Sequence, residues 1–267
     1  MCVLLYSLYW IVGAFLHPLL YIAAPALNFL LPRWQIDRRF GEYTEVPRTD
    51  QDLLIWIHAA SVGEVQAAHA LINALDDTEG AVRFFLTTMT RQGREVALAQ
   101  LPAHVHCELA PVDTLWAVKK ALRVLRPDIY ICLETELWPV MLTEAHKAGI
   151  SMLLLNGRIS ERSYSRYHRI QGTVAAILSG FTTVGVIREQ DGKRFRRLGV
   201  DADKIQVCGN MKYDLEAAES EPVQNKYKQL LKIERETVFI CGSTRKGEES
   251  LLLPVYERLR NNAVAGL

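Results

Sequence analysis

The chain lacks most of the signals that reveal a function on their own. Its five cysteines are an odd number and widely spaced, which fits neither a disulfide framework nor a zinc site and suits a reducing compartment. The formal net charge of +1 gives no general attraction to nucleic acid. The histidines show no metal-ligand spacing and no nucleophile partner. We therefore expect no metal site and no nucleic-acid partner.

Charged residues are missing from the first 31 positions, which contain no Asp, Glu, Lys or Arg. Such a run is long enough to cross a bilayer, which needs about 20 apolar residues. Arg33, Arg38 and Arg39 follow at once and nothing basic precedes the run, so the positive-inside rule places the rest of the chain in the cytoplasm. A cleaved signal peptide is not expected, because no basic segment precedes the run and no small-residue cleavage site lies before the arginines. We predict a membrane anchor over residues 1–31.

Two prolines leave the form of this anchor open. Pro18 and Pro25 fall inside the apolar run, and proline in a helix interior removes a hydrogen bond and bends the helix. A spanning helix, a broken or interfacial helix, and a helix buried in protein remain the alternatives.

After the anchor, apolar strand-like runs alternate with amphipathic helical stretches. This alternation predicts an α/β fold, with crossover connections and a mainly parallel sheet covered on both faces. The predicted strands are 53–58, 82–86, 105–109, 128–133, 152–155, 181–187 and 205–208, and the predicted helices include 65–75, 91–100, 115–125 and 164–178.

The last part of the chain predicts a second domain that is incomplete. Residues 216–236 are polar and are typical of a connecting helix or linker, after which 238–241 would start a strand and a helix would run to Arg260. One strand and one helix cannot cover their own apolar faces. We expect domains at 32–214 and 237–267, joined by a linker at 215–236.

Polar residues follow the ends of several predicted strands. In open α/β sheets, ligands bind in the crevice beyond the carboxyl ends of the strands. Glu134 and Glu136 follow one strand and would share a strand face if the strand continued. They could cap the helix near Pro139, or form part of a site, since paired carboxylates repel unless a ligand or a cation separates them.

Ser61 and Glu64 follow the first strand and open a helix. Their spacing is that of a capping box, with Ser61 as N-cap and Glu64 reaching back to it. The alternative is functional: Gly63 would let a substrate approach the backbone, and Glu64 would act as a general base in the crevice.

Three further loops allow a structural and a functional interpretation. Asn156, Arg158, Ser160 and Arg162 form either a solvated turn or an anion site at a helix N-terminus. Lys212 is either a surface residue or a point charge for a phosphate. The turn at 242–244 resembles a phosphate-binding turn but lacks the glycine spacing of the common nucleotide fingerprints.

Six sequence blocks, in this order, resemble those of the 3-deoxy-D-manno-octulosonic acid (Kdo) transferases of lipid A biosynthesis. Gly157, where the family commonly has Ala, and Arg245, where it often has His, are small departures. The blocks are WIHAASVGE (56–64), LTTMT (86–90), ETELWP (134–139), NGRISERS (156–163), GNMKYD (209–214) and GSTRKGEE (242–249).

The resemblance implies a GT-B-type fold, in which a complete N-terminal Rossmann-like domain is followed by a C-terminal one that is incomplete here. It implies transfer of Kdo from CMP-Kdo to a hydroxyl of a lipid A precursor, lipid IVA, without a metal or cofactor. The enzyme would be anchored at the cytoplasmic face of the inner membrane. The family's CMP-binding residues would lie mainly beyond Leu267.

The resemblance also assigns roles to residues. Glu64 would be the proton acceptor, and Glu134 and Lys212 would stabilise the transition state. Two alternative functions remain. The chain could be another membrane-associated GT-B glycosyltransferase, or it could be an inactive product that retains only acceptor binding. The expected substrate-binding residues are Ser61, Gly63, Glu136, Asn156, Arg158, Ser160, Arg162, Asn210, Ser243 and Glu248.

Overall fold

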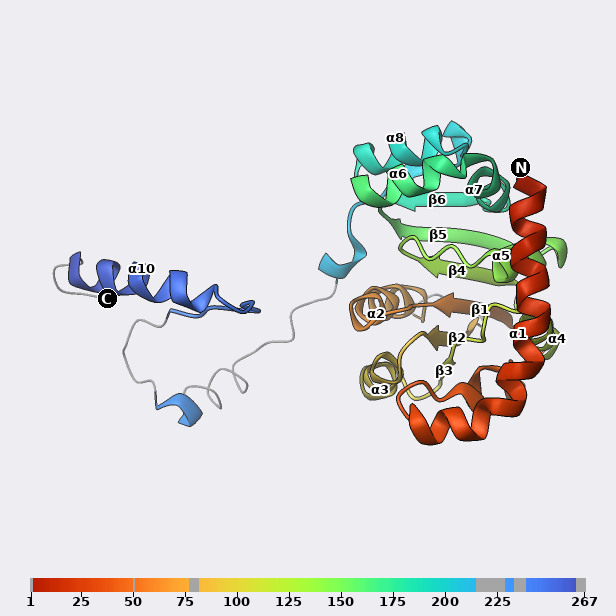
Figure 1. Cartoon of the computed structure of the whole chain (residues 1–267), viewed down its shortest axis with the longest axis horizontal. Coiled ribbons are helices and arrows are strands. Elements are labelled where there is room, and N and C mark those ends of the chain that lie inside the picture. The colour runs from red at the N-terminus through yellow and green to blue at the C-terminus, as the bar shows by residue number, and fades with distance from the viewer. Residues whose placement is uncertain (1, 50, 77–81, 215–228, 233–238, 263–267) are drawn as a thin grey trace. The chain divides into compact units, whose positions relative to one another are not determined.

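The computed structural model describes residues 2–49, 51–76, 82–214, 229–232 and 239–262. The chain divides into two compact units, Met1–Leu215 and Glu216–Leu267 (Figure 1). Most of the predicted linker lies outside the described residues.

The first unit contains the predicted parallel sheet. Its seven strands have the order β3-β2-β1-β4-β5-β6-β7, and every neighbouring pair is parallel. All seven strands occur where the sequence predicts them, with ends that differ by at most two residues. The strands are β1 (Leu53–His58), β2 (Val82–Thr88), β3 (His106–Leu109), β4 (Ile129–Leu133), β5 (Ser151–Gly157), β6 (Thr183–Val186) and β7 (Ile205–Val207).

Side chains alternate between the two faces of the sheet and build a core on each. In β1, Leu54 and Trp56 belong to one buried cluster, and Ile55 and Ile57 belong to the other. This is the period of two expected of an extended strand, and it explains why β1 is apolar throughout instead of alternating with polar residues.

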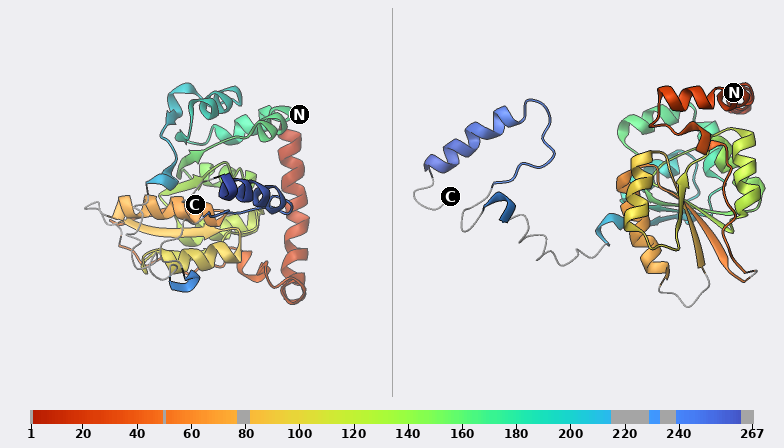
Figure 2. Two further views of the ribbon diagram at one scale, coloured as in Figure 1. Left: turned by 90° about the vertical axis from the view of Figure 1, so that its left-hand side faces the viewer. Right: turned by 90° about the horizontal axis from the view of Figure 1, so that it is seen from below.

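Helices connect the strands and cover both faces (Figures 1 and 2). The predicted helix 164–178 is wrong as a single element, because it is interrupted at Ile170. The first half buries no side chain whereas the second buries Val174, Ile177 and Leu178, so the two halves pack differently. The helices are α2 (Val62–Asp76), α3 (Arg91–Gln100), α4 (Leu115–Leu125), α5 (Pro139–Lys147), α6 (Glu161–Arg169), α7 (Gln171–Leu178) and α8 (Glu189–Arg197).

The strand order reverses between β1 and β4. The chain moves outward from β1 to β2 and β3, then returns to place β4 on the other side of β1. Such a switch point opens a crevice at the carboxyl ends of the two strands, where ligands bind in open α/β sheets. The loops that follow β1 and β4 carry Ser61, Glu134 and Glu136, and Glu64 lies in the first turn of α2, directly after the first of these loops.

The apolar N-terminus forms one helix, α1 (Cys2–Leu30), which continues through Pro18 and Pro25. Its segment Ser7–Leu30 is long and apolar enough to cross a membrane by length and composition. Only 11% of the most apolar stretch is buried, so the alternative of a helix buried in protein is wrong for these residues.

In the second unit, α10 (Glu249–Asn262) is the helix predicted to run to Arg260. The predicted strand 238–241 is wrong for Phe239, Ile240 and Cys241, which form no strand, while Val238 lies outside the described residues. A strand needs a neighbour to pair its backbone groups, and the described residues of this unit contain no other strand.

Candidate functional site

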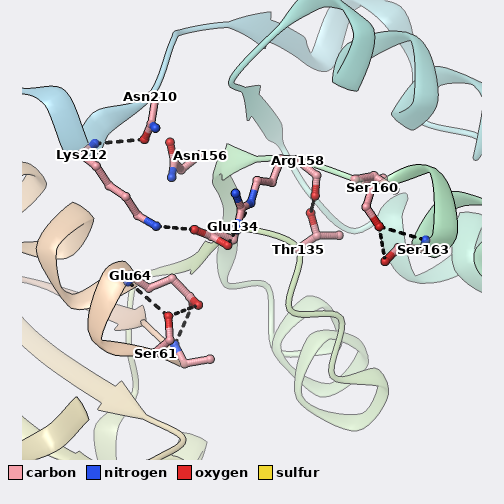
Figure 3. Close-up of polar contacts among 12 residues, drawn as sticks. Ser61, Glu64, Glu134, Thr135, Asn156, Arg158, Ser160, Ser163, Asn210 and Lys212 are labelled. Atoms are coloured by element: carbon pink, nitrogen blue, oxygen red, sulfur yellow. Dashed lines mark hydrogen bonds and ion pairs between the residues drawn. The ribbon is translucent and has the colours of Figure 1, made fainter. Parts of the chain in front are cut away.

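Four loops at the carboxyl edge of the sheet bring the predicted residues of the first unit together. Figure 3 shows Ser61 and Glu64 at the start of α2, facing Glu134 beyond β4, with Lys212 reaching in from the loop after β7. The residues come from positions up to 151 apart in sequence, as the spacing of Ser61 and Lys212 shows.

Glu64 is a buried carboxyl with few hydrogen-bond partners. Its side chain is 4% exposed and accepts hydrogen bonds from the Ala60 N–H and the Ser61 hydroxyl, both at 2.8 Å. Burial raises its pKa to about 7, and the negative charges of Glu134 and Glu136 add to the effect, against the two hydrogen bonds. A carboxyl with a pKa near neutrality is suited to accepting and releasing a proton.

The capping interpretation of Ser61 and Glu64 is also supported by contacts. Ser61 Oγ lies 3.4 Å from the Glu64 backbone nitrogen, as in a capping box. The Glu64 carboxylate, however, reaches the N–H of Ala60 and not that of Ser61. The cap holds the carboxylate in place, so the structural role and the chemical role do not exclude each other.

Strand β4 ends at Leu133 and does not continue through Glu134, so the condition under which Glu134 and Glu136 would share a strand face is not met. Glu134 has a φ of +57°, the left-handed region, because its N–H still bonds to Leu155 O at 2.9 Å and the chain then turns away. A non-glycine residue rarely adopts this conformation, and such strain is common at functional sites.

Two cations hold the Glu134 carboxylate. Lys212 Nζ lies 2.7 Å from Oε1, and Arg158 Nε lies 3.3 Å from Oε2. All three side chains have some contact with solvent, and Glu134 is the least exposed of them. These three groups together carry one excess positive charge, and the carboxyls of Glu64 and Glu136 lie nearby.

Gly63 provides the space for the Lys212 ammonium group. A Cβ at position 63 would lie 3.2 Å from Lys212 Nζ, which is closer than an ordinary contact. The missing side chain therefore lets Lys212 reach Glu134 beside the first turn of α2. The sequence predicted that Gly63 lets a substrate approach the backbone, and the structure shows that the absence of a side chain also leaves room for Lys212.

Asparagines position the loop that carries Lys212. Asn156 is 2% exposed, has a φ of +55°, and accepts the Met211 N–H at 3.2 Å. Asn210 is the N-cap of the short 3-10 helix η3 (Met211–Tyr213) and accepts the Lys212 N–H at 3.2 Å. The Asn156 amide nitrogen is buried and has no partner among the described residues.

A second group of predicted residues lines an open pocket of about 680 Å³. Glu134, Glu136, Arg158, Ser160 and Asn210 line it. Burial raises the pKa of Glu136, and the charge of Glu134 adds to this. Ser160 is the N-cap of α6 and accepts the Ser163 N–H at 3.1 Å.

Arg162 is exposed on the first turn of α6 and does not line the pocket. Sequence reasoning missed Arg188 and Arg194, which do. Arg188 comes two residues after the end of β6, so the strand-end argument that found Glu134 would have found it. Arg194 lies on α8 and binds Ile159 O and Glu161, a contact that no sequence spacing reveals.

Ser243 and Glu248 belong to the second unit. Ser243 has a φ of +57°, and a Glu248 carboxylate oxygen accepts the Arg245 N–H at 2.8 Å. Among the described residues of the chain, no group of three or more His, Cys, Asp or Glu could hold a metal ion.

The sequence matches known proteins over most of its length. A family model described as 3-Deoxy-D-manno-octulosonic-acid transferase (kdotransferase) matches residues 34–215. The chain is 30% identical to the 3-deoxy-D-manno-octulosonic acid transferase of Rickettsia bellii, in an alignment that covers 96% of this chain and 60% of that protein. It is also 30% identical to the transferase of the same name from Haemophilus influenzae, covering 77% and 48%.

A bifunctional glycosyltransferase/methyltransferase of Fusobacterium nucleatum is likewise 30% identical, over 78% of this chain and 33% of that protein. The chain thus spans between a third and three fifths of the length of these relatives.

Solved structures with the same fold have little sequence identity to the chain. The UDP-GlcNAc 2-epimerase from Methanocaldococcus jannaschii gives a TM-score of 0.56 at 14% identity, covering 79% of this chain and 63% of that one. The enzyme from Neisseria meningitidis, bound to UDP-GlcNAc, gives 0.56 at 12% identity, covering 79% and 62%. These likenesses agree with the predicted α/β, GT-B-type fold, and the match of the family model to most of the chain shows that it belongs to the Kdo transferase family of glycosyltransferases.

Proposed function

We propose that the protein transfers Kdo from CMP-Kdo to a hydroxyl of a lipid A precursor, lipid IVA, with Glu64 as the proton acceptor. The observation that carries the proposal is the buried Glu64 carboxyl, whose pKa is raised to about 7, facing the Glu134–Lys212 ion pair. Membership of the family suggests the reaction, and the arrangement of Glu64, Glu134 and Lys212 suits it.

In this reaction the acceptor hydroxyl attacks the anomeric carbon of Kdo. Glu64 takes the hydroxyl proton, a new carbon–oxygen bond forms, and CMP leaves with the electron pair of the bond to its phosphate. Glu134 stabilises the positive charge that develops on the sugar, and Lys212 stabilises the negative charge on the departing phosphate. A preorganised ion pair in a partly buried crevice serves this purpose without rearrangement.

The other polar residues would bind the anionic groups of both substrates. Arg158 already lies against Glu134, and Ser160 caps α6, whose N-terminus favours negative charge. The full proposed set is Ser61, Gly63, Glu136, Asn156, Arg158, Ser160, Arg162 and Asn210 in the first unit, with Ser243 and Glu248 in the second.

We propose a separate role for each part of the chain. We assign residues 32–214 to binding of the acceptor, 215–236 to a linker and 237–267 to the donor-binding domain, with residues 1–31 as the anchor at the cytoplasmic face of the inner membrane. The apolar helix α1 and the arginines that follow it support this location.

A transfer assay tests the proposal. The intact protein is incubated with CMP-Kdo and lipid IVA, and the lipid is analysed by mass spectrometry. We expect a product heavier by one or more Kdo residues, dependent on CMP-Kdo. A product with another sugar, formed from another nucleotide sugar while CMP-Kdo is left unused, would assign the chain a different glycosyl transfer.

A further inference from the structure

From Leu8 onward, helix α1 has one face that is apolar and exposed. Its residues are spaced by three, four or seven positions, which places them on one side of a helix. Their exposed fractions run from 52% for Val12 to 86% for Phe29. The members of this apolar stripe are Leu8, Val12, Phe15, Leu19, Ile22 and Phe29.

The opposite face of α1 is hydrogen-bonded to the α/β body near its start and in the middle, and its end is bonded to the segment that directly follows it. The Tyr9 hydroxyl donates to Asp113 at 2.9 Å, and a His17 ring nitrogen lies 2.7 Å from the Thr114 hydroxyl. Near the end of the helix, Asn28 Oδ1 accepts the Ile36 N–H at 2.7 Å. Figures 1 and 2 show α1 lying alongside the unit.

These contacts extend over most of the thickness of a membrane. Tyr9 and the buried Ala24 are 15 positions apart in sequence, which is about 22 Å along a helix, and the hydrocarbon core is about 30 Å thick. If α1 crossed the bilayer with its contacts kept, Asp113 and Thr114 would lie within the hydrocarbon, where ionisable groups are costly. If α1 left the unit in order to cross, Asp113 would lose one of its hydrogen bonds and the apolar contacts of Ala24 would be broken.

The surface beside the stripe suits anionic headgroups. Trp116 on α4 is half exposed, and its ring lies 5.5 Å from that of His17 on α1. Lys119, Lys120 and Arg123 share the exposed face of α4 with Trp116, at spacings of three, four and seven residues. Lys119 also lies 3.5 Å from Glu144 and Lys120 lies 2.6 Å from Glu42, so both lysines have a carboxylate partner as well as contact with solvent. Tryptophan and basic side chains are favoured at the headgroup level of membranes with anionic lipids.

We propose that α1 lies in the plane of the bilayer surface as an interfacial helix, with the apolar stripe among the acyl chains and the exposed face of α4 among anionic headgroups. This keeps every contact between α1 and the unit and removes the stripe from water. The inference rests on the membrane association proposed above, and is independent of the sugar that is transferred.

The orientation also relates the bilayer to the site. Asp113 and Thr114 follow the carboxyl end of β3, on the same edge of the sheet as Glu64 and Glu134. An in-plane α1 therefore holds this edge of the sheet close to the lipid surface, from which an acceptor lipid would present its sugar.

Spin labels on the stripe measure the orientation. The full chain is labelled through one introduced cysteine at a time, Leu8→Cys, Phe15→Cys, Ile22→Cys or Phe29→Cys, after replacement of the native Cys2, Cys208 and Cys241 by serine. It is bound to vesicles of phosphatidylcholine and phosphatidylglycerol, and the depth of each label is read from its collision rates with oxygen and a nickel complex. We expect four similar, shallow depths.

A spanning helix would give a different depth profile, with positions 15 and 22 deep and positions 8 and 29 near opposite surfaces, and this result would overturn the proposal while leaving membrane association intact. Absence of vesicle binding, together with a dimer in sedimentation, would show that a second copy of the chain covers the apolar stripe. This result would overturn both the in-plane orientation and the membrane association.

The basic face is tested separately. The triple variant Lys119→Ser, Lys120→Ser, Arg123→Ser should bind the anionic vesicles at least about tenfold more weakly, since each basic residue near an anionic surface contributes to the affinity. Arg196→Ser, a change of an exposed cation on α8, is the control and should have no effect. Equal binding by the triple variant and the wild type would contradict the role of α4.

Discussion

At the residue scale, Glu64 is the group on which the proposed chemistry depends, and replacement by glutamine keeps the size of the side chain but removes its ability to take a proton. Glu64→Gln in the intact protein should lower turnover by about 10²–10⁴-fold, the usual effect of losing a general base. Kdo transfer to lipid IVA, followed by mass spectrometry, measures it. Glu95→Gln, which removes an exposed carboxylate paired with Arg91, is the control. Normal turnover with a stability loss of about 1 kcal/mol would show that Glu64 is only a cap.

The raised pKa of Glu64 predicts a pH dependence of opposite sense for turnover and for stability. Turnover should fall as the pH drops below about 7, because the base becomes protonated. The folded state holds this proton more tightly than the unfolded state does, so its contribution to stability is complete below the unfolded pKa of about 4.5 and is lost as the pH rises to about 7. Urea unfolding of wild type and Glu64→Gln between these pH values measures the difference. A difference that is constant across the range would contradict the raised pKa.

Gly63 offers a change in which activity and stability should move apart. In Gly63→Ala the new methyl group crowds the Lys212 ammonium, so turnover should fall, while helix propensity improves by up to about 1 kcal/mol. Gly13→Ala, where the added methyl makes an ordinary contact with Thr114, is the control. Transfer assays and thermal unfolding measure the two effects. Unchanged turnover would mean that Lys212 is free to move without loss.

Much of the site could be predicted at this scale, because a polar residue after an apolar strand is visible in the sequence. The backbone conformation of Glu134 could not be predicted from the sequence. Its positive φ depends on the pairing with Leu155 and on the two cations that hold its carboxylate, and these come from β5 and from the loop after β7. The orphan amide of Asn156 is equally invisible without the fold.

At the scale of elements, α1 is linked to the site loop through a half-buried aspartate. Asp113 accepts the N–H groups of Val140 at 3.0 Å and Met141 at 2.8 Å, so it caps α5, whose first turn directly follows the loop 134–138. Burial raises the pKa of Asp113, and the bonds from Val140, Met141 and Tyr9 oppose this. One carboxylate thus joins the apolar helix to the segment that carries Glu134 and Glu136.

Removal of this carboxylate should destabilise the first unit. Asp113→Ala leaves the start of α5 without its cap and is expected to lower the free energy of unfolding by about 0.5–2 kcal/mol. Tyr9→Phe removes only one hydrogen bond to the same carboxylate and should cost about 0.5–1.5 kcal/mol. Urea unfolding of the detergent-solubilised chain measures both. Equal stability of Asp113→Ala and wild type would mean that α5 needs no cap.

The strands and most helices of the first unit were predictable because most of the strands carry an apolar run and most of the helices keep their period. The break at Ile170 was not, since 164–178 has no proline or internal glycine pair to mark it and the two halves differ only in what they pack against. The strand at 239–241 was predicted from an apolar run alone, and an apolar run does not provide the neighbour that a strand requires.

At the scale of the whole molecule, the division into two units predicts how the polypeptide of residues 1–267 handles the donor. Within the described residues, the second unit offers the turn at Ser243 and helix α10, which is little surface for a nucleotide. We expect no saturable binding of CMP up to about 1 mM by calorimetry, a limit set by the weakest affinity that is readily measured. Micromolar binding would place the nucleotide site among the residues of this chain.

The contacts of α1 also determine an order of events during synthesis. Tyr9 and Asp113 are 104 positions apart, and His17 and Thr114 are 97 apart. At about 5–20 residues per second, the ribosome adds Asp113 roughly 5–20 s after Tyr9. Throughout that interval the helix has left or is leaving the ribosome without the partners that later hold it. A lipid surface or a chaperone must cover its apolar residues in the meantime, so the helix is bound by one of the two before the sheet is complete.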